Sequence, residues 1–74
     1  MRVRLKLHGW LRDFLPGNGA TVHVPEGTTA LGAMDLLRIP VGPCLWVVNG
    51  EAAAYDTELH EGDRLDVALM AAGG

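Results

Sequence analysis

The chain has 74 residues, enough for one domain with a small core, and 49% of them are apolar while 20% are charged. The net charge of −3, with no run of Lys or Arg, argues against a nucleic-acid surface, and no apolar segment is long enough to span a membrane. The single Cys44 excludes an internal disulfide. We therefore expect a cytoplasmic protein that binds or carries rather than catalyses.

The N-terminal part predicts two short strands joined by a helical turn and a loop. Residues 2–8 alternate polar and apolar side chains, as in a half-buried strand, and residues 21–24 do the same. Between them, the apolar spacing over 10–15 predicts one or two helical turns before a Pro/Gly loop. The two strands should pair as a hairpin. The inner-face residues are expected to be Val3, Leu5, Leu7, Val22 and Val24.

Residues 28–40 predict the main helix of the protein. Thr28 or Thr29 can cap its start, and Pro40 ends it. Gly32 inside the helix costs about 1 kcal/mol relative to Ala, which a close contact between helix and sheet would explain. The apolar stripe expected to face the sheet consists of Ala30, Leu31, Met34 and Leu37.

The C-terminal part predicts three further strands. Residues 44–48 are apolar on both sides, which indicates a central strand covered on both faces, and a strong turn signal follows at 49–50. A weak strand is expected around 52–54, and a last alternating strand over 64–70. The fold class is therefore α+β, with a mixed sheet and one main helix on one face.

Few side chains have the spacing that catalysis or metal binding requires. The three histidines His8, His23 and His60 lack a second ligand at a metal-binding distance in sequence, so surface positions are expected. Cys44 begins an apolar strand, where a buried structural cysteine is the usual case. The acidic residues between 58 and 66 are typical of a turn and of the outward side of a strand. We expect no catalytic set and no metal site.

Trp46 offers a candidate binding patch. If Leu45 and Val47 face the helix, Trp46 faces the uncovered side of the sheet and presents an apolar surface to a partner. The patch would consist of Trp46, Val48, Ala68 and Met70. The opposite register buries Trp46 in the core, and the sequence leaves both alternatives open.

The last four residues, 71–74, read AAGG and form the main candidate site. Each side chain is a methyl group or a hydrogen, so the segment can enter a narrow channel, and it reaches at most about 13–14 Å. Ala71, Ala72 and Gly73 would thread the Gly74 carboxylate into a partner. Once activated as an acyl-adenylate, that carboxylate accepts sulfide or an amine. The alternative is that residues 71–74 are a frayed chain end and not a site.

The whole chain resembles the ThiS/MoaD family of sulfur-carrier proteins. RVRLKLHGWLRDF is similar to the family's opening strand and turn, and VPEGTTALGAMDLL to its second strand and helix. VVNGE is similar to the central strand and turn, and LHEGDRLDVALMAAGG to the last strand and diglycine tail. The resemblance implies the ubiquitin-like β-grasp fold of four to five strands over residues 1–70, with a flexible tail at 71–74.

The resemblance also implies a function for Gly74. An E1-like partner would adenylate it with ATP, a sulfur donor system would convert it to a thiocarboxylate, and a downstream synthase, such as the molybdopterin synthase large subunit, would receive the sulfur. The carrier itself would bind no cofactor tightly. The MAAGG ending is similar to thiamine-pathway carriers, whereas GWLRDF slightly favours molybdopterin or tungstopterin. A ubiquitin-like modifier conjugated through Gly74 and a non-catalytic interaction subunit are the alternatives.

Overall fold

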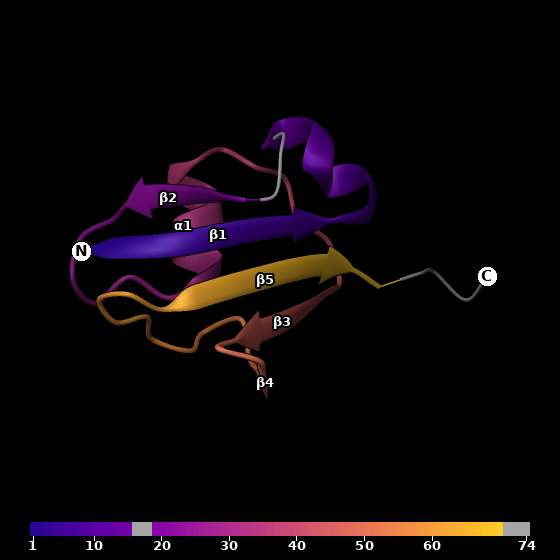
Figure 1. The fold of residues 1–74 in the computed structure, drawn as a ribbon. Coiled ribbons are helices and arrows are strands. Elements are labelled where there is room, and N and C mark those ends of the chain that lie inside the picture. The colour runs from indigo at the N-terminus through magenta and orange to yellow at the C-terminus, as the bar shows by residue number, and fades with distance from the viewer. Residues whose placement is uncertain (16–18, 71–74) are drawn as a thin grey trace.

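The computed structural model describes residues 1–15 and 19–70, which form a five-stranded mixed sheet with one α-helix on one face (Figure 1). The elements in chain order are β1 (Arg2–His8), the 3-10 helix η1 (Gly9–Phe14), β2 (Ala20–His23), α1 (Ala30–Leu36), β3 (Cys44–Val48), β4 (Glu51–Ala53) and β5 (Arg64–Leu69). The strand order across the sheet is β2-β1-β5-β3-β4. The predicted α+β layering is confirmed.

The last strand of the chain, β5, lies in the middle of the sheet. It pairs in parallel with β1 and antiparallel with β3, while β1 and β2 form the predicted antiparallel hairpin (Figure 1). Strand β3 lies next to β5, one strand away from the centre of the sheet. Its outer side chain Leu45 is 52% exposed, so the prediction that both faces of this strand are covered is wrong. With a single α-helix packed on it, the sheet has one covered face and one open face.

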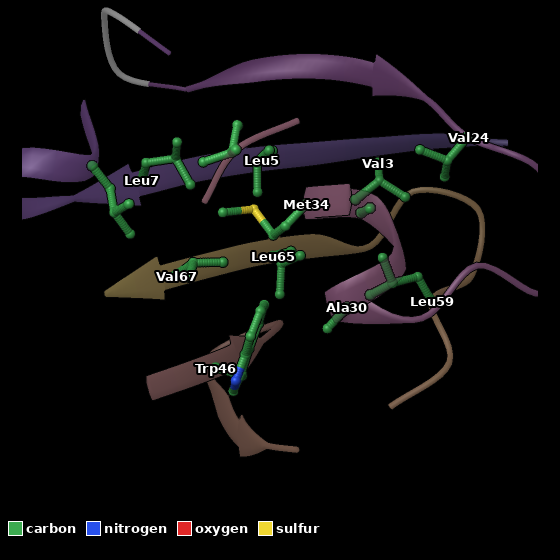
Figure 2. Packing of buried hydrophobic residues seen from close by; sticks show 13 residues of the cluster. Val3, Leu5, Leu7, Val24, Ala30, Met34, Trp46, Leu59, Leu65 and Val67 are labelled. Carbon is green, nitrogen blue, oxygen red and sulfur yellow. The ribbon is translucent and has the colours of Figure 1, made fainter. Parts of the chain in front are cut away.

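The core fills the space between α1 and the inner face of the sheet (Figure 2). The alternation of β1 explains its contribution, because every second side chain points to the same face. Burying a Leu or Val side chain stabilises the fold by roughly 1.5–3 kcal/mol. The buried apolar residues are Val3, Leu5, Leu7, Leu11, Val24, Ala30, Ala33, Met34, Ile39, Trp46, Leu59, Leu65 and Val67. Val22, also predicted to point inward, is half-buried at the margin of this core.

The start of α1 explains the unusual glycine inside it. The Thr29 hydroxyl caps the helix by accepting a hydrogen bond from the Gly32 amide at 3.0 Å. A β-carbon at Gly32 would lie 3.1 Å from that hydroxyl oxygen, which is a crowded contact. Gly32 thus leaves space for the cap, and the close contact with the sheet that we expected is not the reason for it.

The helix is shorter than predicted at its C-terminal end. It stops at Leu36, and Arg38 adopts a positive φ of 57°, which turns the chain back toward the sheet. Leu37, predicted to face the core, is therefore exposed, and Ile39 is buried instead. At seven residues α1 is short, and no helix in the described parts of the chain is long and apolar enough to cross a membrane.

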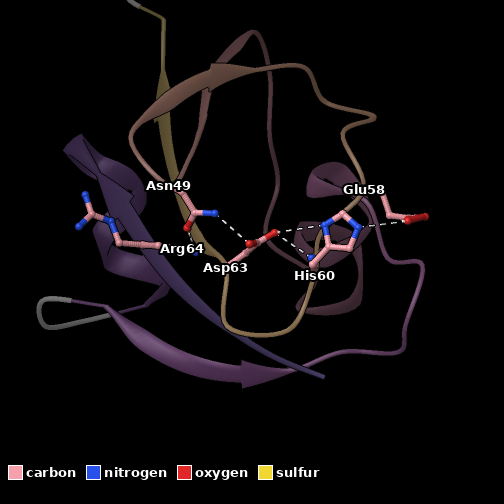
Figure 3. A network of polar contacts seen from close by, with 5 residues as sticks. All are labelled: Asn49, Glu58, His60, Asp63 and Arg64. Atoms are coloured by element: carbon pink, nitrogen blue, oxygen red, sulfur yellow. Dashed lines mark hydrogen bonds and ion pairs between the residues drawn. The ribbon is translucent and has the colours of Figure 1, made fainter.

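Two turns are joined at one end of the sheet by the Asn49 side chain (Figure 3). Asn49 and Gly50 both have positive φ, 52° and 84°, as the tight hairpin between β3 and β4 requires. The Asn49 amide nitrogen donates to Asp63 Oδ1 at 2.9 Å, and Asn49 Oδ1 accepts from the Arg64 amide at 2.9 Å. Asp63 Oδ2 accepts from the His60 amide at 2.8 Å. These contacts place the start of β5, and they confirm a turn role for Asp63.

Two leucines on opposite faces of the sheet test this account of the core. Leu65→Ala empties a fully buried position and should lower the free energy of unfolding by about 2–5 kcal/mol. Leu45→Ala shortens a half-exposed side chain on the open face and should cost less than about 1 kcal/mol. Urea denaturation followed by circular dichroism measures both. Equal losses would contradict the assignment of the two faces.

Candidate functional site at the end of β5

The predicted site residues Ala71, Ala72, Gly73 and Gly74 lie outside the described residues, but the structure shows where they are attached. Strand β5 ends at Leu69, and the Met70 amide donates to the Pro43 carbonyl at 2.9 Å. Strand β5 is hydrogen-bonded to a strand on each side, so residue 70 directly follows the central strand of the sheet. We call this point the tail root.

The helical turn predicted from GWLRDF lies at the same end of the sheet as the tail root. Strands β1 and β5 are parallel, and His8 at the end of β1 is opposite Ala68 near the end of β5. The helix η1 begins directly after His8 and packs against both strands, with Leu11 buried. A partner that approaches the tail root therefore comes close to η1 as well.

The predicted patch around Trp46 does not form one surface. Trp46 is only 7% exposed and packs in the core, because it lies opposite Val67, which faces the helix (Figure 2). Val48 shares that side of β3, whereas Ala68 points to the opposite face of the sheet. Met70 is exposed beyond the end of β5. The interpretation with an exposed Trp46 is wrong, since the bulky indole is buried and the smaller Leu45 faces outward.

Leu45, Val47 and Ala68 form the apolar surface of the open face. Leu45 lies opposite Ala68, and Val47 lies opposite Asp66 in the register of β3 and β5. These residues border a shallow hollow of about 410 Å³, which we call the open-face hollow. Its lining consists of His8, Leu45, Val47, Arg64, Asp66 and Ala68. Sequence reasoning missed Leu45 and Val47, although placing Trp46 in the core by itself turns both outward.

Asp66 is a nearly buried carboxylate in the floor of this hollow. It is 7% exposed, its Oδ1 lies 3.0 Å from His8 Nε2, and its Oδ2 accepts from Arg64 Nε at 3.0 Å. Partial burial by itself would raise the pKa of Asp66, but the hydrogen bonds from His8 and Arg64 outweigh it and lower the pKa. Asp66 is thus ionised at neutral pH, and His8 Nε2 must donate to it. The sequence pattern had predicted solvent-facing positions for both His8 and Asp66.

Cys44 lies on the helix side of the sheet, opposite Leu69 near the tail root. It is half-buried, and burial raises the pKa of its thiol more than a backbone hydrogen bond at Gly42 lowers it. A protonated thiol is a poor nucleophile, which agrees with the structural role predicted for it. Among residues 1–15 and 19–70, no group of three or more His, Cys, Asp or Glu side chains could hold a metal ion.

Comparison with known protein families shows to which family the chain belongs. The model of the ThiS family matches residues 5–74. The chain belongs to the ThiS family. Among curated proteins, no sequence matches it significantly.

Solved structures similar to this ThiS-family chain share its fold. SAMP1 from Haloferax volcanii has a TM-score of 0.77 and 24% identity, with 100% of each chain covered. Another structure of H. volcanii small archaeal modifier protein 1 has a TM-score of 0.75 and 23% identity, covering 92% of this chain and 95% of the other. A protein from Pyrococcus furiosus named as molybdopterin converting factor subunit 1 has a TM-score of 0.74 and 20% identity, covering 93% and 97%. The fold is the predicted ubiquitin-like β-grasp.

The ion pairs of Asp66 predict a specific dependence of stability on pH. Its pKa is lowered in the folded state, so its contribution is present above the ordinary Asp value of about 3.9 and is lost as the pH falls through the lowered pKa. Asp66→Asn removes this contribution. Urea denaturation from pH 7 downward should therefore show the wild type losing its advantage over the variant only below about pH 4.

The control for this experiment is Asp35→Asn, which changes an exposed carboxylate on α1. This variant should follow the wild type at every pH. If Asp66→Asn also stays parallel to the wild type across the range, Asp66 does not stabilise the fold through its charge.

Proposed function

We propose that this ThiS-family protein is a sulfur carrier and not an enzyme, and that the Gly74 carboxylate carries the sulfur. The observation that carries the proposal is the family match, which covers residues 5–74 and so includes the AAGG segment. The position of the tail root supports it, because β5 attaches this segment to the centre of a stable sheet. In this proposal residues 1–70 are the β-grasp domain that a partner recognises, and residues 71–74 are the part that enters its active site.

The chemistry proposed for Gly74 needs a partner at each step. In an E1-like adenylating enzyme, a carboxylate oxygen of Gly74 attacks the α-phosphorus of ATP, and pyrophosphate leaves. Sulfide from a sulfur donor system then attacks the acyl carbon, AMP leaves, and the Gly74 thiocarboxylate remains. Gly73 and the two alanines have small side chains, so this segment can pass through a narrow channel in the partner. The carrier needs no resident cofactor, and we place these ATP-dependent steps in the cytoplasm.

We propose molybdopterin or tungstopterin as the first choice for the product that receives the sulfur, with the thiamine thiazole next. The GWLRDF segment supports this order, since it forms η1 and packs against β5 near the tail root. The name of the Pyrococcus furiosus neighbour points in the same direction. The downstream partner would then be a molybdopterin synthase large subunit.

The second candidate is a ubiquitin-like modifier. Two of the similar structures are named as small archaeal modifier protein 1 or its abbreviation, and the proposed activation serves this function equally. A lysine amine that attacks the acyl-adenylate of Gly74 would displace AMP and form an amide. The two functions thus share the first step and differ in the nucleophile of the second. A non-catalytic interaction subunit would need neither the activation of Gly74 nor the attack by a nucleophile.

The thiocarboxylate can be detected directly on protein purified from its native cells. We expect a thiol-selective alkylating reagent to label the C-terminal peptide of a Cys44→Ser variant, because Gly74 then carries the only reactive sulfur. Fragmentation in the mass spectrometer must place the label on Gly74, since replacing oxygen by sulfur has the same nominal mass as one Met oxidation. Deletion of Gly74 is the control and should abolish the label. Labelling that persists after the deletion would contradict the proposal.

Conjugation distinguishes the modifier from the carrier. An N-terminally tagged protein expressed in the same cells should run as a single species on a denaturing gel if it is only a carrier. Bands of higher mass that disappear when Gly74 is deleted would establish the modifier function instead. If neither label nor conjugates are found, the interaction subunit is the function that remains.

A further inference from the structure

Arginine side chains gather at the end of the sheet that lies opposite the tail root. Arg2 and Arg4 alternate with the core residues of β1 and so point to the open face. In the parallel register of β1 and β5, Arg4 lies directly opposite Arg64, which also lines the open face. Both strands run toward the tail root, so their first residues lie at the far end (Figure 1). We call Arg2, Arg4 and Arg64 the arginine cluster.

The position of Arg4 opposes folding. Neighbouring strands are only about 5 Å apart, and like charges directly opposite each other on them are destabilising. The chain has nine Asp and Glu residues, yet within residues 1–15 and 19–70 none of them forms an ion pair with Arg4. Proteins keep such unfavourable contacts mainly where a function requires them. An anion bound beside Arg4 would remove the repulsion.

The carboxylates beside the other two arginines orient them and leave most of their donors free. Arg2 Nε donates to Glu61 Oε2 at 3.1 Å, and Arg64 Nε donates to Asp66 Oδ2 at 3.0 Å. A guanidinium has five N–H donors, and each carboxylate takes the one on Nε. Among the described residues, the terminal nitrogens of both side chains make no hydrogen bond. They are therefore held in place and available to a ligand.

A second shallow hollow, of about 210 Å³, lies beside Arg4. Its lining consists of Arg2, Val3, Arg4, Thr21, Glu61 and Gly62. Thr21 is exposed and lies opposite Arg4 in the register of β1 and β2, so its hydroxyl adds a neutral donor. Glu61 is the one carboxylate of this lining. Its ion pair with Arg2 is exposed on both sides, so it contributes little and can give way to another anion.

We propose that the arginine cluster and Thr21 bind the phosphate group of a small ligand, either inorganic phosphate or diphosphate or a phosphate monoester. The planar donors of a guanidinium match the oxygens of a phosphate group in pairs, which a single point charge does not do. Arg4 supplies the positive charge that no carboxylate of the described chain balances. The inference goes beyond the proposed function, since it does not involve Gly74.

The extent of the site favours a small ligand over a nucleic acid. A nucleic-acid backbone is bound by cations that neutralise several successive phosphates, whereas this chain has a net charge of −3. Toward β3 the open face becomes apolar at Leu45 and Val47, and the open-face hollow has no aromatic side chain on which a base could stack. The surface thus offers one phosphate site and no path for a chain of them.

The test is an NMR titration of the full-length, nitrogen-15-labelled protein with inorganic phosphate, pyrophosphate and AMP, with sodium chloride keeping the ionic strength constant. We expect saturable shifts of the Arg4, Thr21 and Arg64 amide signals. Saturable binding of any of the three probes supports the proposal, and the probe that binds most tightly shows whether the source is free phosphate or an ester. Arg4→Gln should weaken binding about tenfold or more. Glu61→Gln should strengthen it, because the competing carboxylate is gone.

The repulsion between Arg4 and Arg64 gives a second measurement. Without phosphate, Arg4→Gln should raise the urea midpoint of unfolding, because a like-charge contact is removed. Adding phosphate should raise the midpoint of the wild type and leave that of Arg4→Gln almost unchanged. The matched control is Arg12→Gln, which removes the same charge from an exposed position in η1, beyond the other end of β1. It should keep the midpoint and the phosphate binding of the wild type.

Two results would overturn the inference. One is a set of shifts that do not saturate and are equal in the wild type, Arg4→Gln and Arg12→Gln, because these would show only general ionic effects. The other is saturable binding of a polyuridine RNA at concentrations where none of the three small probes binds, which would assign the cluster to nucleic acid. None of these measurements uses Gly74, so they stand whether or not the carrier function is correct.

Discussion

The parallel pairing of the first and last strands is the interaction on which the rest of the structure depends. Leu5 lies beside Leu65 in this register, and both side chains are fully buried under α1. Because the partners are 60 positions apart, the chain must close a long loop before the pairing stabilises it. The pairing also places β5 in the middle of the sheet. The tail root is therefore attached to a strand that cannot be displaced without breaking the core.

Because side chains alternate along β5, this strand contributes residues to both faces of the sheet. Leu65 and Val67 point to the helix and supply the core, whereas Asp66 and Ala68 point to the open face. The core and the open-face hollow thus depend on adjacent residues of one strand, and they are separated only by the direction in which each side chain points. A shift of one residue in the register of β5 would exchange the two faces and destroy both.

Asp66 is the buried carboxylate of the open face, and its contact with His8 links β5 to β1. A carboxylate that is almost fully buried must be paired, and His8 and Arg64 hold it from two strands. This contact neutralises part of the charge on Arg64, which lines the same hollow as Leu45 and Ala68. On β1, Lys6 lies directly opposite Asp66, and Arg4 lies opposite Arg64.

Local patterns in the sequence were sufficient to predict most elements, because strand alternation, the Thr29 cap and the turn at 49–50 depend on neighbouring residues. The candidate tail also followed from composition and order alone. The sequence could not predict on which face of the sheet Trp46 lies, because CLWVV is apolar at every position and only the pairing with β5 selects its register. For the same reason the hollow around Asp66 could not be predicted: its lining comes from three strands that are brought together when β5 inserts between β1 and β3.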